Sequence, residues 1–161
     1  MIAIRTCKML LLAATAFFFT LVAFNNLTDF DSNYQFVRHV LMMDSTFPGN
    51  HGMWRAIRAP WIHVAFYLSI IAWEILNAFL GWWGSIALFR SLQSPQPKFH
   101  RARQIGVVAL TSGMLQWFIA FLCVGAEWFL MWQSTLWNGQ DAAFRMFAAE
   151  ALILVILLLP E

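Results

Sequence analysis

The sequence predicts an all-α membrane protein, in which four transmembrane helices form a bundle and short amphipathic helices occupy the first outer loop. Two observations carry this prediction. Of the 161 residues, 61% are hydrophobic and only 11% are charged, whereas a soluble domain carries about 25% charged residues. In addition, apolar stretches long enough to cross the roughly 30 Å hydrocarbon core of a bilayer recur along the chain.

The apolar stretches define four spans and make residues 1–161 a single transmembrane domain. The first span covers about 9–27 and follows Arg5 and Lys8, which is also how a signal peptide begins. It continues through bulky residues without a small-residue cleavage site, so we expect a retained anchor helix. The other three spans cover about 61–89, 104–132 and 142–159.

Basic residues predict the orientation of these spans. The N-terminal segment and the inner loop 90–103 together carry six Lys and Arg residues and no acidic residue. The opposite side carries four Arg residues, diluted by four Asp residues. The positive-inside rule therefore places both termini and the loop 90–103 in the cytoplasm.

The outer loop 28–60 is too long for a simple turn. Its segment 33–44 has apolar residues along one helical face, which predicts a short helix lying on the outer membrane surface. Pro48 and Gly49 then turn the chain before a second short helix over 53–58.

Glu74 is the most unusual residue of the expected spans. It lies near the middle of the second span, about 20 Å from its outer end. An acidic side chain at that depth costs roughly 2.5–3.5 kcal/mol on insertion scales, so Glu74 needs a partner or a proton.

Polar and small side chains follow one helical stripe on each of the two middle spans. In the second span the stripe comprises His63, Tyr67, Glu74, Asn77 and Gly81. In the third span it comprises Gly113, Gln116, Cys123 and Glu127. Because these spans run antiparallel, inward-facing stripes would bring Glu74 to Gln116 and His63 to Glu127.

Two interpretations of these stripes remain open. Polar residues at helix interfaces commonly form hydrogen bonds that hold a bundle together. The alternative is an intramembrane polar site that binds a cofactor or quinone-like ligand or provides a proton path. Its candidate residues are His63, Glu74, Asn77, Gln116 and Glu127.

Glu127 is the weaker of the two acidic candidates. It lies near the outer end of its span among several Trp residues, and Trp favours the headgroup level of a membrane. A carboxylate at that depth reaches water or a basic partner, so Glu127 is equally consistent with an interfacial surface position.

Other functional classes lack their usual signals. His63 is the only histidine in a span, which disfavours haem held by two histidines, and no HxxxH or HExxH spacing indicates a metal site. Cys7 and Cys123 show no pairing motif. The chain has no dense basic run of a nucleic-acid binder and no hydrolase motif, so we expect no nucleic-acid partner, cofactor or enzymatic activity.

Several strings of the outer side carry a family resemblance. NYQFVRHVLMMDSTFPGN (33–50), MWRAI (53–57) and EWFLMWQSTLWNGQDAAFR (127–145) resemble a family of predicted small bacterial integral membrane proteins, domain of unknown function 2165. The resemblance implies a four-span protein of the bacterial inner membrane. It implies no activity, cofactor or catalytic residue.

Two functions fit these observations. The first is a non-catalytic accessory or interaction subunit, in contact with the bilayer and with a larger membrane complex or further copies of itself. Small-residue contacts such as GWWG (81–84) favour it. The second is a membrane ligand-binding protein for a quinone, a lipid or an ion, which would use the polar stripe. A pocket lined by the stripe would favour the second.

Overall fold

The computed structural model describes residues 1–160, and the regular elements of that range are helices. The five α-helices are α1 (Ile2–Thr28), α2 (Phe30–Met42), α3 (Pro60–Ser91), α4 (Gln96–Leu115) and α5 (Gln140–Leu158). A π-helix, η2 (Gln116–Trp128), continues α4 directly. Two 3₁₀ turns, η1 (Met53–Arg55) and η3 (Met131–Gln133), lie in the loops.

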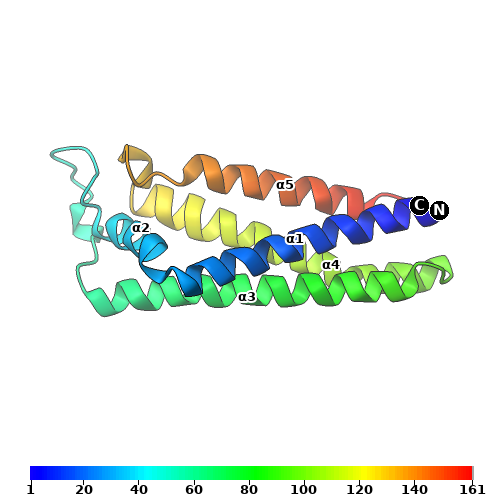
Figure 1. Cartoon of the computed structure of the whole chain (residues 1–161). Coiled ribbons are helices and arrows are strands. Elements are labelled where there is room, and N and C mark those ends of the chain that lie inside the picture. Colours follow the sequence, from blue (N-terminus) through cyan, green and yellow to red (C-terminus); the bar gives the residue numbers. More distant parts are fainter. Residues whose placement is uncertain (161) are drawn as a thin grey trace.

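Four helical rods run side by side along one long axis: α1, α3, α4 with η2, and α5 (Figure 1). Both termini and the α3–α4 connection lie at one end of the molecule, and α2 with the 43–59 loop lies at the other. We call the second end the α2 end.

Three of the rods are long and apolar enough to cross a membrane. They are α1 with 27 residues, α3 with 32 and the continuous rod from Gln96 to Trp128 with 33. The rod formed by α5 has 19 residues and includes Asp141, Arg145 and Glu150, so its length and composition alone do not identify it as a span.

The connection between α3 and α4 is shorter than the sequence suggested. We expected a loop over 90–103, but α3 continues to Ser91 and α4 begins at Gln96. The first turn of α4 contains Pro97, and proline is well tolerated there because its missing N–H has no helical partner. Only residues 92–95 therefore connect the two helices.

Basic side chains bind the ends of helices at the terminal end of the molecule. Arg5 Nη1 donates a hydrogen bond to Leu92 O at 2.9 Å, just beyond α3, and Lys8 Nζ donates to Leu159 O. Arg103 donates to the last carbonyls of α5. A cation at a helix C-terminus is stabilising, since the free carbonyls carry partial negative charge. Three of the six basic residues counted on this side thus also have a structural role.

Glycines allow close helix crossings along α3. A Cβ placed on Gly81 would lie 2.8 Å from Ala16 Cβ of α1, and one on Gly84 would lie 3.0 Å from the backbone nitrogen of Gly106 in α4. The interfaces of α3 with α1 and α4 are the most extensive in the molecule. The small residues of GWWG therefore serve contacts within the chain.

The amphipathic helix α2 covers the end of the bundle. Val37, Val40 and Leu41 are buried in a cluster that includes Tyr67 and Phe129. We had expected this helix to lie on the outer membrane surface, and its place relative to a membrane stays a prediction. Its apolar face packs on the protein, because the four rods leave an apolar surface of their own at this end.

Polar contacts hold the 43–59 loop and the 129–139 loop together beside α2. Gln133 Oε1 accepts hydrogen bonds from Phe47 N at 3.1 Å and from Asn50 Nδ2 at 3.2 Å. Ser45 Oγ donates to Ser134 Oγ at 2.8 Å. The two most distinctive strings of the sequence, around TFPGN and MWQS, therefore contact each other and stabilise the α2 end.

Candidate functional site

A buried carboxylate lies where α1, α2 and α3 meet. Glu74 of α3 is 3% exposed, and its Oε2 accepts a hydrogen bond from Asn26 Nδ2 of α1 at 2.8 Å. Asn26 Oδ1 in turn accepts from Asn33 Nδ2 of α2 at 2.6 Å. Tyr67 donates its hydroxyl to the backbone oxygen of Asn26 at 3.4 Å. Three helices thus hold one oxygen of the carboxyl group in place.

The second oxygen of Glu74 is available to a ligand. Among residues 1–160, no side chain or backbone group donates a hydrogen bond to Oε1. The carboxyl group lines a cavity of about 240 Å³, which we call the Glu74 cleft. Its polar lining comes from Glu74, Asn26, Asn33 and Tyr67, and the rest is mainly apolar.

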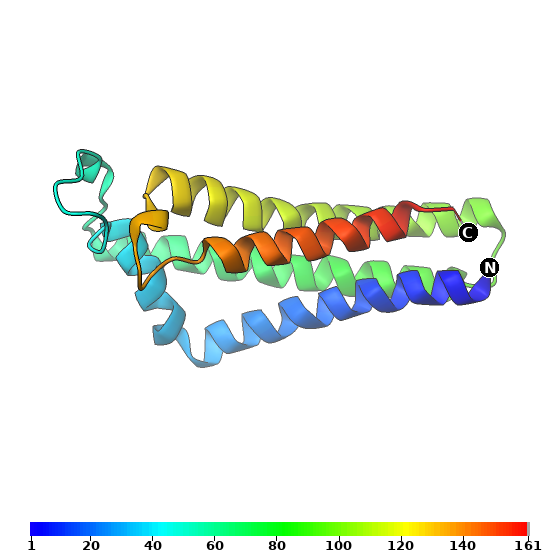
Figure 2. The same ribbon diagram turned by 90° about the horizontal axis from the view of Figure 1, so that it is seen from above.

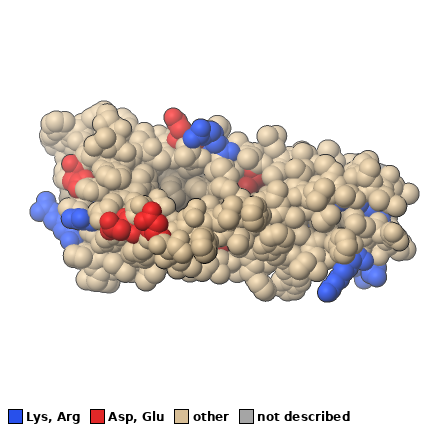
Figure 3. Space-filling model, in the orientation of Figure 1, with Lys and Arg blue, Asp and Glu red and all other residues tan. Residues whose placement is uncertain are grey.

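The Glu74 cleft opens sideways between helices. Its walls come from α1 and α2 on one side, from α5 on the other, and from α3 and η2 behind. Seen from above, α1 moves away from α5 toward the α2 end (Figure 2). The space-filling view, which has the orientation of Figure 1, shows a hollow between α5 and the α1–α2 region (Figure 3). The cleft therefore opens at the side of the bundle and not at either of its ends.

Charged groups lie mostly toward the two ends of the molecule. The visible end with the termini shows Lys and Arg only, the α2 end shows both signs, and uncharged residues cover most of the surface between them (Figure 3). An uncharged belt of this kind suits contact with lipid chains.

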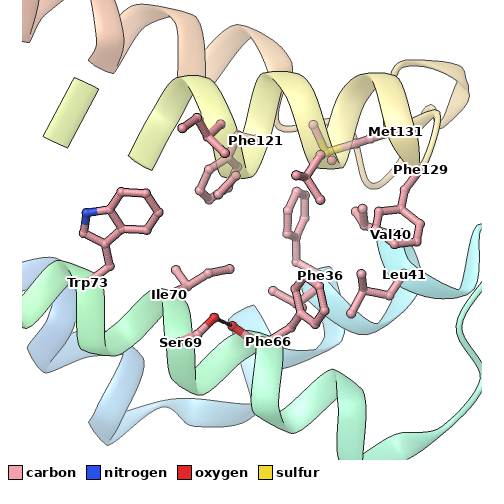
Figure 4. A pocket seen from close by; sticks show the side chains of 15 residues that line it. Phe36, Val40, Leu41, Phe66, Ser69, Ile70, Trp73, Phe121, Phe129 and Met131 are labelled. Carbon is pink, nitrogen blue, oxygen red and sulfur yellow. Dashed lines mark hydrogen bonds between the residues drawn. The ribbon is translucent and has the colours of Figure 1, made fainter. Parts of the chain in front are cut away.

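A second cavity, of about 220 Å³, lies between α3 and η2 beneath α2. We call it the apolar cavity. Phe36, Phe66, Ile70 and Phe121 point into it, together with Met131 (Figure 4). An apolar cavity of about 150 Å³ in a protein core is enough to hold benzene, so this one has room for a larger hydrocarbon group.

Polar groups in the wall of the apolar cavity already have partners. Ser69 Oγ donates to the Phe66 carbonyl at 2.7 Å, and Trp73 Nε1 donates to Ser112 Oγ at 3.0 Å. Figure 4 shows the first of these bonds. The cavity thus presents hydrocarbon and aromatic surface to whatever enters it.

The π-helix η2 forms a wall of both cavities. Its hydrogen bonds join residues five apart, as in the bond from Phe129 N to Val124 O at 3.0 Å. Each turn therefore takes more residues than an α-helical turn. Gln116, at the start of η2, is buried, but Cys123 and Glu127 rotate off the inward face and are exposed. The α-helical stripe predicted for this span ends at Gln116 for this reason.

A hydrogen bond joins the polar stripes predicted for the two middle spans, but it does not join the residues that the sequence analysis paired. Asn77 Nδ2 donates to Gln116 Oε1 at 2.7 Å, and both residues are buried. Glu74 binds Asn26 of α1, so the predicted Glu74–Gln116 pair is wrong. The sequence could not show that α1 supplies the partner, because the neighbours of a helix depend on the whole bundle.

His63 and Glu127 also do not pair. His63 is buried at the start of α3, and its Nε2–H donates to Ile57 O at 2.8 Å. Its Nδ1 has no hydrogen-bond partner within the described chain. Glu127 is exposed and borders a separate surface hollow with Gln140 and Asp141. The structure thus places both residues outside the Glu74 cleft.

Glu150 is a second buried carboxylate, for which the sequence offered no partner. It is 1% exposed, and its Oε1 accepts a hydrogen bond from Trp117 Nε1 at 3.0 Å. Its Oε2 has no partner among the residues described and faces Gly113, where a Cβ would lie 2.1 Å away. Trp117 also lines the Glu74 cleft. One indole ring therefore separates the cleft from Glu150.

Asn26 could have been identified from a pattern in α1. Its buried residues recur every three or four positions: Arg5, Lys8, Leu12, Ala16, Phe19, Ala23 and Asn26. A polar amide at the end of an inward-facing stripe indicates a buried hydrogen-bond partner. Asn33 lies on a different helix, and its sequence shows no comparable signal.

Metal coordination has no geometric support in residues 1–160, where no three His, Cys, Asp or Glu side chains gather as ligands. Cys7 and Cys123 are free and exposed. The chemistry of the Glu74 cleft is therefore that of a carboxyl group with one held oxygen and one accessible oxygen.

Comparison with known proteins identifies one match. The family model described as "Predicted small integral membrane protein (DUF2165)" matches residues 4–160. No curated protein and no solved structure matches the chain.

Proposed function

We propose that this chain, which belongs to the family of predicted small integral membrane proteins (DUF2165), binds an amphiphile with a hydroxyl-bearing head and an apolar chain. The head would lie in the Glu74 cleft and the ligand would enter sideways from the bilayer. Long-chain alcohols and isoprenoid quinols both have this chemistry.

The accessible oxygen of Glu74 is the observation that carries the proposal. Glu74 as a whole is 3% exposed, and a ligand in the cleft would exclude water from Oε1, so that ligand has to supply a hydrogen bond to this oxygen. A ligand hydroxyl in the cleft would donate its proton to the ionised Oε1 of Glu74. The hydrogen bond from Asn26 to Oε2 fixes the orientation of the carboxyl group and therefore the position of Oε1.

The proposed membrane arrangement has four spans in the bacterial inner membrane. We assign α5 as the fourth span because it packs along α4 and η2. Its deepest acid, Glu150, is covered by the protein, while Asp141 and Arg145 lie exposed near its first turns. The positive-inside rule would place the end with both termini in the cytoplasm and α2 on the outer side.

The proposal predicts that Glu74→Gln removes ligand binding and leaves the fold intact. The amide oxygen of Gln can still accept from Asn26, but its NH₂ group would then point into the cleft and could not accept the ligand's hydroxyl proton. A hydrogen bond to a charged group contributes roughly 1.5–3 kcal/mol, so labelling by a photoactivatable (diazirine-bearing) hexadecanol should fall about tenfold or more. Labelling is measured by mass spectrometry on purified protein in detergent.

Glu127→Gln is the matched control, because it makes the same change at an exposed carboxylate outside the cleft. Its labelling should equal that of the unaltered protein. The methyl ether of the same alcohol lacks the O–H donor and should not compete with the labelling. Competition by an isoprenoid quinol would show that the cleft also binds this second class of ligand. Equal labelling of the protein and Glu74→Gln would disprove the proposed site.

An accessory-subunit role is the second candidate, favoured by apolar side chains exposed at the α2 end. Trp54, Trp61 and Leu136 are 73%, 72% and 80% exposed, and large aromatic residues are enriched in protein interfaces. Purification from native membranes in mild detergent, with mass spectrometry and an absorption spectrum, tests it. A stoichiometric partner protein without a bound amphiphile would favour the accessory role; an amphiphile bound to the lone chain would favour the first proposal.

A further inference from the structure

The Glu74 cleft and the apolar cavity are neighbours with a common wall. Four residues line both: Phe36, Val37, Ile70 and Phe121. They come from α2, α3 and η2, which meet toward the α2 end of the molecule. The cavities therefore lie on two sides of a single layer of side chains.

The common wall consists of side chains that can move. Phe36 and Phe121 both project toward the apolar cavity between the helices (Figure 4). Neither ring has a polar group that would tie it to one position. A change of rotamer in an aromatic or aliphatic side chain is a fast motion and needs no shift of a helix. A ligand that entered the cleft could displace this wall.

We propose that the chain of the bound amphiphile passes beneath α2, from the Glu74 cleft into the apolar cavity. This inference rests on the proposed function, which places the head of the same molecule at Glu74. The cleft supplies the polar contacts and the apolar cavity supplies none, because Ser69 and Trp73 already have hydrogen-bond partners. The two cavities thus match the two chemical parts of one ligand.

The dimensions of the cavities agree with a shared ligand. The Glu74 cleft measures about 240 Å³ and the apolar cavity about 220 Å³. Small-molecule pockets usually enclose 300–1,000 Å³, so each cavity alone is small for a long amphiphile. Joined, they fall within that range.

The helix α2 would then cover the ligand where head and chain meet. Its residues Phe36 and Val37 form part of the common wall. Asn33 borders the cleft, and Val40 and Leu41 border the apolar cavity. The hydrogen bonds between the 43–59 and 129–139 loops keep α2 in place. This position explains why a helix with an apolar face is packed on the bundle end.

Two forms of hexadecanol test the inference on the unaltered protein in detergent. One carries a diazirine beside the hydroxyl and the other carries it at the chain end. The first should label peptides of the cleft, such as that containing the buried Asn26, and the second should label peptides of the apolar cavity, such as that containing the buried Leu41. Peptide mass spectrometry locates both labels.

A pair of substitutions separates the two cavities. Ala120 lines the apolar cavity, so the ring of Ala120→Phe would occupy the space that the chain needs and should lower chain-end labelling there about tenfold. Labelling beside the hydroxyl should remain in the cleft. Ala72 is exposed on α3, and Ala72→Phe is the matched control that should change neither label.

The outcomes distinguish this inference from the proposed function. If the chain-end probe labels only cleft or lipid-facing peptides while the first probe still labels the cleft in a Glu74-dependent way, the shared path is wrong and the head site stands. If neither probe labels the cleft, both are wrong. The positional labels come from the unaltered protein, so the test holds even where Ala120→Phe fails to fold.

Discussion

Gly84→Leu is expected to separate α3 from α4 and to unfold the protein under conditions in which the unaltered chain is stable. A Cβ at this position already lies 3.0 Å from the backbone nitrogen of Gly106 and 3.1 Å from its Cα. Backbone atoms cannot turn aside as a side chain can, so the whole helix would have to move. Overpacking commonly costs 1–3 kcal/mol, and we expect at least about 3 kcal/mol here, since leucine adds a full side chain.

The free energy of unfolding can be measured by circular dichroism during SDS titration of the detergent-solubilised protein. Ala72→Leu is the control, because Ala72 is exposed on the same helix and the larger side chain would project into detergent. It should change stability by less than about 0.5 kcal/mol. Equal stability of Gly84→Leu and the control would show that α3 and α4 do not cross at these two glycines.

Gly113→Ala is expected to displace the buried Glu150 carboxyl group. The new Cβ would lie 2.1 Å from Glu150 Oε2 and 3.0 Å from Phe19 Cζ. The carboxyl group would have to rotate away, and its hydrogen bond with Trp117 Nε1 would be lost. An unsatisfied buried donor costs about 1–3 kcal/mol, so the free energy of unfolding should fall by that amount.

A double-mutant cycle with Glu150→Ala tests this explanation. Glu150→Ala removes the atoms that clash, so Gly113→Ala should cost little in its presence, and the two effects should deviate from additivity by about 1–2 kcal/mol. Gly125→Ala is the control, since its Cβ would meet neighbours at ordinary distances of 3.4–3.5 Å. Additive effects of the two substitutions would show that Gly113 and Glu150 are not in contact.

The Glu74 cleft shows how far reasoning from the sequence reached. Glu74 itself was predicted as a buried acid, because a charge in the middle of an apolar stretch is conspicuous in any sequence. Its partner Asn26 was not predicted, because the expected partners of the second span all came from the third span. Glu150 is an acid in the apolar last helix, and its partner Trp117 appears only when α5 packs against η2.

The π-helix is the clearest case of a feature that the local pattern did not predict. The run from Gln116 to Trp128 is apolar throughout most of its length, so its hydropathy fits an α-helix equally well. The change in hydrogen-bonding alters which residues face inward, and it moved Cys123 and Glu127 to the surface. In this register η2 packs against α5 and against η3. Neither contact can be predicted from the thirteen residues of η2 alone.

The sequence by itself determined the membrane class and the three long apolar helices, because hydropathy and length are local properties and the bilayer requires both. It also determined the apolar face of α2, which follows from helical periodicity. Only the tertiary structure decided that α2 covers the bundle end, that the GWWG glycines serve contacts inside the chain, and that Asn26 holds Glu74 beside an open cleft. Such choices depend on the phase and the neighbours of each helix, and these arise from packing among residues far apart in the chain.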